Sequence, residues 1–228
     1  MFIRFSNTLS TVLFVSVLVN TAAGAANDIA AGRIVGGQDA VPGRYSYIVA
    51  LLDATINLEA ICGGSLIAPD VVLTAAHCFD GTTNILDNIF ILTRPYDLSD
   101  PAPESEVFSL QASILHPSYL SSGVEYDVAL LKLNGTSTNQ SMAMLNQDPG
   151  FPTPGQLTTE MGWGDTTNMD AVYPNVLQVL ESGKYISLEE CAGINNNPNN
   201  AFRTAIFDDA LCTVTPEGQG SCLGDSGT

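Results

Sequence analysis

Basic side chains are scarce in this 228-residue chain. Lys and Arg together number 7 against 24 Asp and Glu, which gives a formal net charge of −17. A surface of that sign repels the phosphates of nucleic acids and the anionic faces of membranes at ordinary salt. We therefore expect neither a nucleic-acid partner nor a membrane partner.

Side chains that bind metals tightly are also few. The chain has two histidines, His77 and His116, and five cysteines. Neither the CxxC…CxxC nor the CxxC…HxxxH spacing of a structural zinc site is present. The sequence therefore predicts no metal site, and we expect no cofactor.

Apolar residues are plentiful, at 45% of the chain, so a sizeable core is possible. Near the N-terminus, the single basic residue Arg4 is followed by an apolar run over 12–19 and a small-residue run over 22–25. The apolar run is about half the roughly 20 residues that span a bilayer. Residues 1–25 therefore read as a signal peptide rather than an anchor, and we expect a secreted, extracellular protein in which cysteines oxidise.

Two N-glycosylation sequons lie close together, at Asn134-Gly-Thr136 and Asn139-Gln-Ser141. Attached sugars require a surface loop in a secreted protein, and this polar stretch fits that requirement. Such triplets also arise by chance, so occupancy at Asn134 and Asn139 stays open.

Short β-prone runs separated by turns dominate the chain from Tyr45 onward, with no long helical period. This pattern predicts an all-β sandwich or barrel. The runs are 47–52, 64–67, 71–73, 89–92, 107–114, 128–133, 157–161 and 176–180. The Pro- and Gly-rich segment 148–155 predicts a domain boundary. One short helix is expected after Ser187, with Glu190 completing a capping box, and 195–200 reads as a surface loop.

Five separated motifs have to be explained together. Physically, a serine hydroxyl is a poor nucleophile until an imidazole takes its proton, and that imidazole needs an acceptor on its other nitrogen. One His, one Asp and one Ser satisfy this need. The motifs are Arg33-Ile-Val-Gly-Gly37, Leu73-Thr-Ala-Ala-His-Cys78, Asp127-Val-Ala-Leu-Leu-Lys-Leu133, Gly162-Trp-Gly164 and Gly220-Ser-Cys-Leu-Gly-Asp-Ser-Gly227.

With these motifs the sequence resembles the chymotrypsin family of secreted serine proteases, over Arg33 to Thr228. The resemblance implies an all-β fold of two antiparallel Greek-key barrels, over 34–147 and 148–228, the second one incomplete. The chain order His, Asp, Ser is that family's order. It implies that His77 is the general base, Asp127 its orienting acceptor and Ser226 the nucleophile. His116 is expected to be structural.

The resemblance also implies an oxyanion hole and a zymogen. The oxyanion donors would be the backbone N–H groups of Gly224 and Ser226. Residues 26–33 would form an activation propeptide. Cleavage after Arg33 would free the α-amino group of Ile34, which would pair with Asp225 and shape the oxyanion loop.

Cysteine pairing follows from the same resemblance. Cys62 is expected to pair with Cys78 around His77, and Cys191 with Cys212. Cys222 is then left unpaired, because its partner in the family lies downstream of the nucleophile. The family also continues past this point with Gly-Pro, where Thr228 replaces the usual glycine. We therefore expect a fragment or an incomplete gene model, and do not expect a chain that ends at Thr228 to be active by itself.

The sequence gives partial information on which substrate side chain the enzyme would accept. In the family, the residue six positions before the nucleophile lies at the base of the specificity pocket, which here corresponds to Gly220 followed by Ser221. A neutral base would leave a buried Lys or Arg side chain without a partner, so apolar or small residues are expected there. Some relatives place the acid on the pocket wall that this sequence lacks. A neutral pocket would also require a separate trypsin-like protease to activate the precursor at Arg33.

The sequence thus predicts a secreted serine endopeptidase, monomeric, acting on protein or peptide substrates through an acyl-enzyme. The alternative is a non-catalytic homologue that binds a partner protein. The usual mark of such homologues is loss of a triad residue, and His77, Asp127 and Ser226 are all present.

Overall fold

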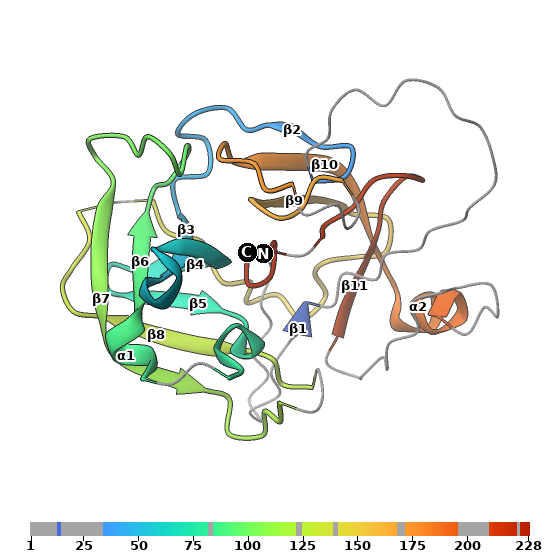
Figure 1. Cartoon of the computed structure of the whole chain (residues 1–228). Coiled ribbons are helices and arrows are strands. Elements are labelled where there is room, and N and C mark those ends of the chain that lie inside the picture. Colours follow the sequence, from blue (N-terminus) through green and yellow to red (C-terminus); the bar gives the residue numbers. More distant parts are fainter. Residues whose placement is uncertain are drawn as a thin grey trace.

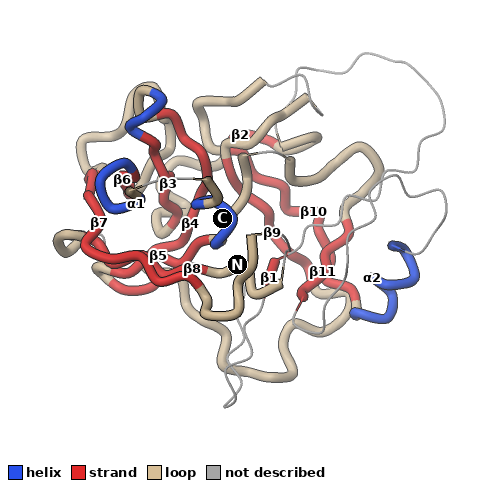
Figure 2. The backbone as a smooth tube through the Cα atoms, turned by 60° about the horizontal axis from the view of Figure 1, so that its bottom comes forward, coloured by secondary structure: helices blue, strands red, loops and turns tan. Residues whose placement is uncertain are grey.

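The regular secondary structure of the computed structural model is almost entirely β-strand, arranged in two halves (Figures 1 and 2). It describes residues 13–14, 34–81, 84–121, 125–138, 141–167, 172–195, 210–222 and 224–228. The propeptide with Arg33, most of the predicted signal peptide, the sequon residue Asn139 and nearly all of the predicted loop 195–200 lie outside these residues. The all-β prediction is confirmed.

The first half is a closed antiparallel barrel of six strands in the order β3-β4-β5-β8-β7-β6. Each of the six predicted runs before residue 134 forms one of these strands. Their bounds are β3 Ile48–Asp53, β4 Glu59–Ala68, β5 Val71–Thr74, β6 Ile89–Thr93, β7 Glu106–Leu115 and β8 Ala129–Leu133.

The first four residues of β3 are buried on both faces of the strand, which explains why they are all apolar. Alternate residues of a strand point to opposite faces. Val49 and Leu51 point into the barrel interior, where they join a core containing Leu66, Ile91 and Leu131 among others. The residues that alternate with them, Ile48 and Ala50, belong to a separate core outside the barrel wall.

That second core joins the two halves. It packs Ile48, Ala50 and Leu92 of the barrel against Met161 and Val179 of the other half, together with Trp163. Each of these side chains is nearly excluded from solvent. Burial of apolar area stabilises by about 25 cal/mol per Å², so this shared surface holds the halves in one arrangement.

The second half is built around the long strand β10 (Gln178–Ile186). Along one edge β10 pairs with β9 (Leu157–Gly162); along the other it pairs first with β2 (Gln38–Asp39) and then with β11 (Ala210–Val214). β1 (Leu13–Phe14) adds a parallel pairing to β11. Among the described strands this sheet is open, and β2 carries the start of the first predicted domain across to it (Figure 1).

Helices are few and short. α2 (Leu188–Asn195) begins as predicted, with the amide of Glu190 donating to the Ser187 hydroxyl at 3.2 Å. Three single-turn helices were not predicted: η1 (Ala54–Ile56), η2 (Ala76–Phe79) and α1 (Ile85–Asn88). No helix in the described ranges has the length and apolar character to cross a membrane.

The segment 224–228 lies between the two halves (Figures 1 and 2). The amide of Gly63 in β4 donates to the carbonyl of Ser226 at 2.8 Å. The Thr228 hydroxyl donates to the carbonyl of Asp225 at 2.7 Å, which closes the turn. Gly227 has a φ of +85° and no room for a Cβ, which would lie 2.5 Å from the Gly63 carbonyl. The barrel wall therefore dictates both the path and the residue type of this turn.

Gly63→Ala is expected to destabilise the protein by about 1–3 kcal/mol, the usual cost of overpacking. The physical reason is that a Cβ at position 63 would collide with Cγ2 of Thr228. Thr228→Ser removes that methyl group and keeps the hydroxyl, so it should recover most of the loss. Denaturant unfolding of the two single variants and the double variant measures both effects. If Gly63→Ala lowers the free energy of unfolding by the same amount in the wild-type and the Thr228→Ser backgrounds, the proposed collision with the methyl group is contradicted.

Candidate active site

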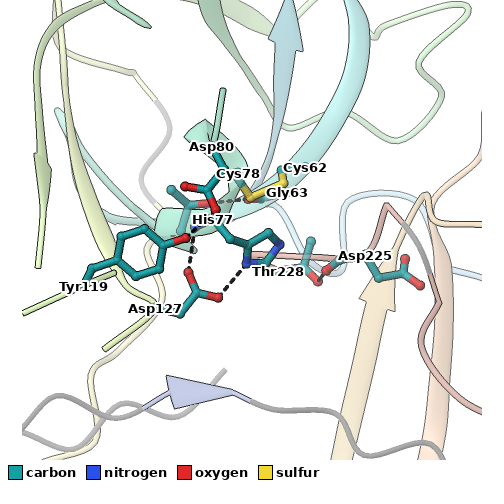
Figure 3. Close-up of a disulfide and its surroundings, with 10 residues drawn as sticks. Cys62, Gly63, His77, Cys78, Asp80, Tyr119, Asp127, Asp225 and Thr228 are labelled. Carbon is teal, nitrogen blue, oxygen red and sulfur yellow. Dashed lines mark hydrogen bonds and ion pairs between the residues drawn. A yellow bond between two sulfur atoms is a disulfide. The ribbon is translucent and has the colours of Figure 1, made fainter. Parts of the chain in front are cut away.

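Strand pairing brings His77 and Asp127 together. β5 ends at Thr74, β8 begins at Ala129, and these two residues are register partners. His77 follows in the η2 turn and Asp127 precedes β8, so both side chains emerge at the same edge of the barrel. His77 Nδ1 lies 2.5 Å from Asp127 Oδ2, and the His77 amide donates to Oδ1 at 2.7 Å (Figure 3).

This contact determines which tautomer the imidazole adopts. A carboxylate only accepts, so the proton between the two groups is carried by Nδ1 and the neutral ring presents an acceptor at Nε2. The Asp127 side chain is 7% exposed, whereas the imidazole is 42% exposed. The pair therefore has a shielded acceptor and a basic nitrogen available at the surface.

The pKa of His77 is raised above its usual 6.5. The hydrogen bond to Asp127 is the largest cause; burial opposes it, and the charges of Asp127 and Asp80 add to it. Asp80 follows η2 three residues after His77 and accepts a hydrogen bond from the Tyr119 hydroxyl at 2.7 Å. Sequence reasoning missed this pair, although the spacing of Asp80 from His77 on a tight turn was a usable signal.

Ser226 is held beside the same barrel edge through its backbone. Gly63, which binds the Ser226 carbonyl, follows Cys62; Cys62 is disulfide-bonded to Cys78, next to His77. The serine is partly buried. In the view of Figure 3 the imidazole lies between Asp127 and the turn that ends at Thr228. One disulfide and one hydrogen bond thus connect the histidine turn to the serine turn.

Gly224, the other predicted oxyanion residue, requires glycine. Its φ is +96°, and a Cβ there would lie 3.1 Å from the Cα of Gly164. A side chain at this position is therefore both strained and crowded.

Asp225 is buried at 7% exposure and receives two backbone hydrogen bonds, from Gly164 at 2.8 Å and Cys222 at 2.9 Å. Burial raises its pKa to about 6, against the effect of these bonds. A Cβ at Gly162 or Gly164 would collide with the carboxylate, which explains the two glycines around Trp163.

The residues that follow the predicted activation site lie against the segment that contains Gly220. The Ile34 side chain is fully buried, and Val35 forms an antiparallel bridge with Gly220, whose amide donates to the Val35 carbonyl at 3.0 Å. Ser221, the second predicted pocket residue, donates its amide to Glu160 Oε2 at 3.1 Å. The sequence motifs did not indicate this contact of Glu160.

The structure also gives the positions of the other cysteines and of His116. Cys191 in α2 is bonded to Cys212 in β11, and Cys222 lies in the Asp225 loop. Ligand atoms of Cys62, His77 and Cys78 lie within 4.8 Å of one another, but the disulfide removes both thiolates as metal ligands. His116 stacks on Tyr126, with ring centroids 4.9 Å apart.

The family model described as Trypsin matches residues 34–228, which is most of the chain. The chain belongs to the trypsin family. It is also 31% identical over 203 residues to Ovochymase-2 of Mus musculus. That match covers 86% of this chain and 31% of the relative, so the chain spans about a third of the relative's length.

Membership of the trypsin family confirms the resemblance drawn from the five motifs, and it places the chain in a family of serine-type hydrolases. The trypsin-like fold is confirmed as well, since a closed six-stranded barrel is accompanied by a second sheet.

The His77 imidazole is expected to titrate with a midpoint above 6.5, and Asp127→Asn should lower that midpoint. An asparagine keeps the shape of the acceptor but removes the charge that favours the imidazolium. NMR titration of the ring protons measures both values, with a His116→Gln variant to assign the two histidines. An unchanged midpoint in Asp127→Asn would show that the carboxylate does not control this proton.

Proposed function

We propose that this chain is the protease domain of a secreted serine endopeptidase, made as a zymogen, that hydrolyses peptide bonds through an acyl-enzyme. The observation that carries the proposal is the His77 imidazole, bonded at Nδ1 to a shielded carboxylate and exposed on its other side. The serine turn, bonded to the barrel at Gly63, supports it. So does membership of the trypsin family.

The first half of the reaction forms an ester. His77 Nε2 takes the hydroxyl proton of Ser226 while Oγ attacks the scissile carbonyl carbon. The oxyanion that develops would be stabilised by the N–H groups of Gly224 and Ser226, each worth about 3 kcal/mol in related sites. The C–N bond then breaks, and the imidazolium returns its proton to the leaving amine. Asp127 remains ionised and stabilises the imidazolium.

The second half consumes water. His77 takes a proton from the attacking water, the ester C–O bond breaks, and the proton returns to Ser226 Oγ. The products are an amine and a carboxylic acid, and both the serine and the histidine are restored. No cofactor enters this sequence.

Protein or peptide substrates follow from family membership. Secretion is supported by the signal-like N-terminus and by two disulfides, which persist in oxidising compartments. We propose a monomer. Asn134 is exposed and would accept a sugar on the barrel surface.

A fluorophosphonate probe tests the nucleophile directly. The secreted protein, once cleaved after Arg33, should be labelled at Ser226, because the probe reacts with an activated serine hydroxyl. Ser226→Ala should give no labelling, and His77→Ala should react orders of magnitude more slowly. Mass spectrometry of the labelled peptide identifies the residue. Absence of labelling in correctly cleaved wild-type protein would reject the enzyme and favour the binding homologue.

The zymogen proposal concerns Asp225 and Ile34. Cleavage after Arg33 would create a positive α-amino group on Ile34, the residue next to the bridge between Val35 and Gly220. Asp225 is a buried carboxylate in the adjoining loop, and a cation beside it would favour its charged form. Such a pair would hold the loop that carries Gly224 and Ser226.

Asp225→Asn is expected to abolish peptide hydrolysis although Ser226 remains. Deleting one partner of a buried ion pair costs about 3–5 kcal/mol, which is enough to release the loop from its active conformation. Peptide hydrolysis by cleaved wild type and variant measures the effect, and circular dichroism checks that both are folded. Turnover equal to wild type in a folded Asp225→Asn protein would contradict the pairing.

A further inference from the structure

Glu160 is a carboxylate inside the second half whose role the catalytic scheme leaves unexplained. It projects from β9, and both of its oxygens are held. Oε1 accepts from the Thr213 hydroxyl at 3.0 Å, and Oε2 accepts from the Ser221 amide at 3.1 Å. The side chain is thereby fixed between β11 and the segment that contains Gly220 and Ser221.

Both donors to Glu160 are neutral. Among the described residues, no Lys, Arg or His forms an ion pair with it. Burial raises its pKa, and these hydrogen bonds lower it, so the site shields the carboxylate without a compensating cation. The site is therefore suited to a positively charged group.

The position of Glu160 relates this charge to the proposed catalytic serine. Ser221 is one residue from Gly220, the proposed base of the specificity pocket, and Gly220 itself contributes no side chain. Glu160 is also close enough to Asp225, the neighbour of Ser226, for its charge to raise the pKa of that group. The carboxylate is thus hydrogen-bonded to the segment that the family resemblance assigns to the base of the pocket, and it lies within electrostatic range of the serine turn.

We propose that Glu160 supplies the negative charge at the base of the specificity pocket, so that the enzyme cleaves after Arg or Lys. The inference rests on the function proposed above and names its substrate class. A guanidinium or ammonium group loses its hydration on entering a pocket, and a fixed carboxylate compensates for that loss. This replaces the expectation of an apolar preference, which considered only position 220.

The proposal also changes the expected route of maturation. The activation bond follows Arg33, which is the residue type that Glu160 would attract. Mature enzyme would then cleave its own precursor, and a separate activator would be needed only to start the process.

The test compares peptide amide substrates that differ only in the residue before the scissile bond: Arg, Lys, Leu or Ala. Wild type should show kcat/KM at least about 100-fold higher for Arg than for Leu. Glu160→Gln should lower kcat/KM for Arg about 100-fold and leave that for Leu within about threefold. Glu217→Gln, an exposed glutamate in the same half, is the matched control and should change neither value.

Glu160→Asp separates charge from packing. It keeps the carboxylate on a shorter side chain, so it should retain a preference for Arg over Leu that Glu160→Gln loses. A wild-type enzyme that prefers Leu or Ala would overturn the proposal. So would a Glu160→Gln variant that loses activity equally on Arg and Leu, because that result describes a structural residue.

Binding of p-aminobenzamidine, followed by its fluorescence, keeps the test independent of turnover. If the fluorophosphonate probe fails to label Ser226, the proposed enzyme is rejected, yet the pocket can still be examined. Binding to wild type and Glu217→Gln but not to Glu160→Gln supports the charge assignment. Equal binding to wild type and Glu160→Gln, or none to wild type, overturns it.

Discussion

The apolar contact between the barrel and the second sheet is the constraint on which the rest of the structure depends. β3 contributes alternate residues to two cores, so the same six-residue strand both fills the barrel and holds the second half against it. The histidine and the aspartate come from the barrel, whereas the serine turn follows β11. Their relative placement is set by packing at this boundary together with the hydrogen bond from Gly63 to Ser226.

Three carboxylates in or beside the site have different surroundings, and these surroundings give the same chemical group different properties. Asp127 faces an imidazole and raises its pKa. Asp225 faces two backbone amides, and its burial makes its charge costly. Glu160 faces an amide and a hydroxyl. A carboxylate without a cationic partner can favour a cation that arrives later, and both the proposed Ile34–Asp225 pair and the proposed specificity role of Glu160 rest on this effect.

Glycines make this arrangement sterically possible. Gly162 and Gly164 leave space for the Asp225 carboxylate, and Gly63 leaves space for Thr228. In each case the missing Cβ belongs to a strand or turn distant in sequence from the residue that fills the space. The glycine-containing motifs therefore mark places where one part of the chain comes very close to another.

Much of the fold was predictable because its signals are local. Eight strand runs, the all-β class and the start of α2 at Ser187 follow from short-range patterns of apolar, turn and capping residues. β1, β2 and β11 were missed. The first two have only two residues each, too few to show an alternating pattern, whereas β11 was not recognised although it is as long as β6. β2 exists only because β10 offers it an unpaired edge.

The amino-acid sequence alone determined which residues form the five motifs, and with them the family to which the chain belongs. Only the tertiary structure decided that Asp127 also accepts from the His77 amide, that β2 joins the second sheet, and that Glu160 accepts from the Ser221 amide. The physical reason is range. Motifs and turn signals act over a few residues, whereas the partner of a buried carboxylate is determined by strand register and packing between segments up to 61 residues apart.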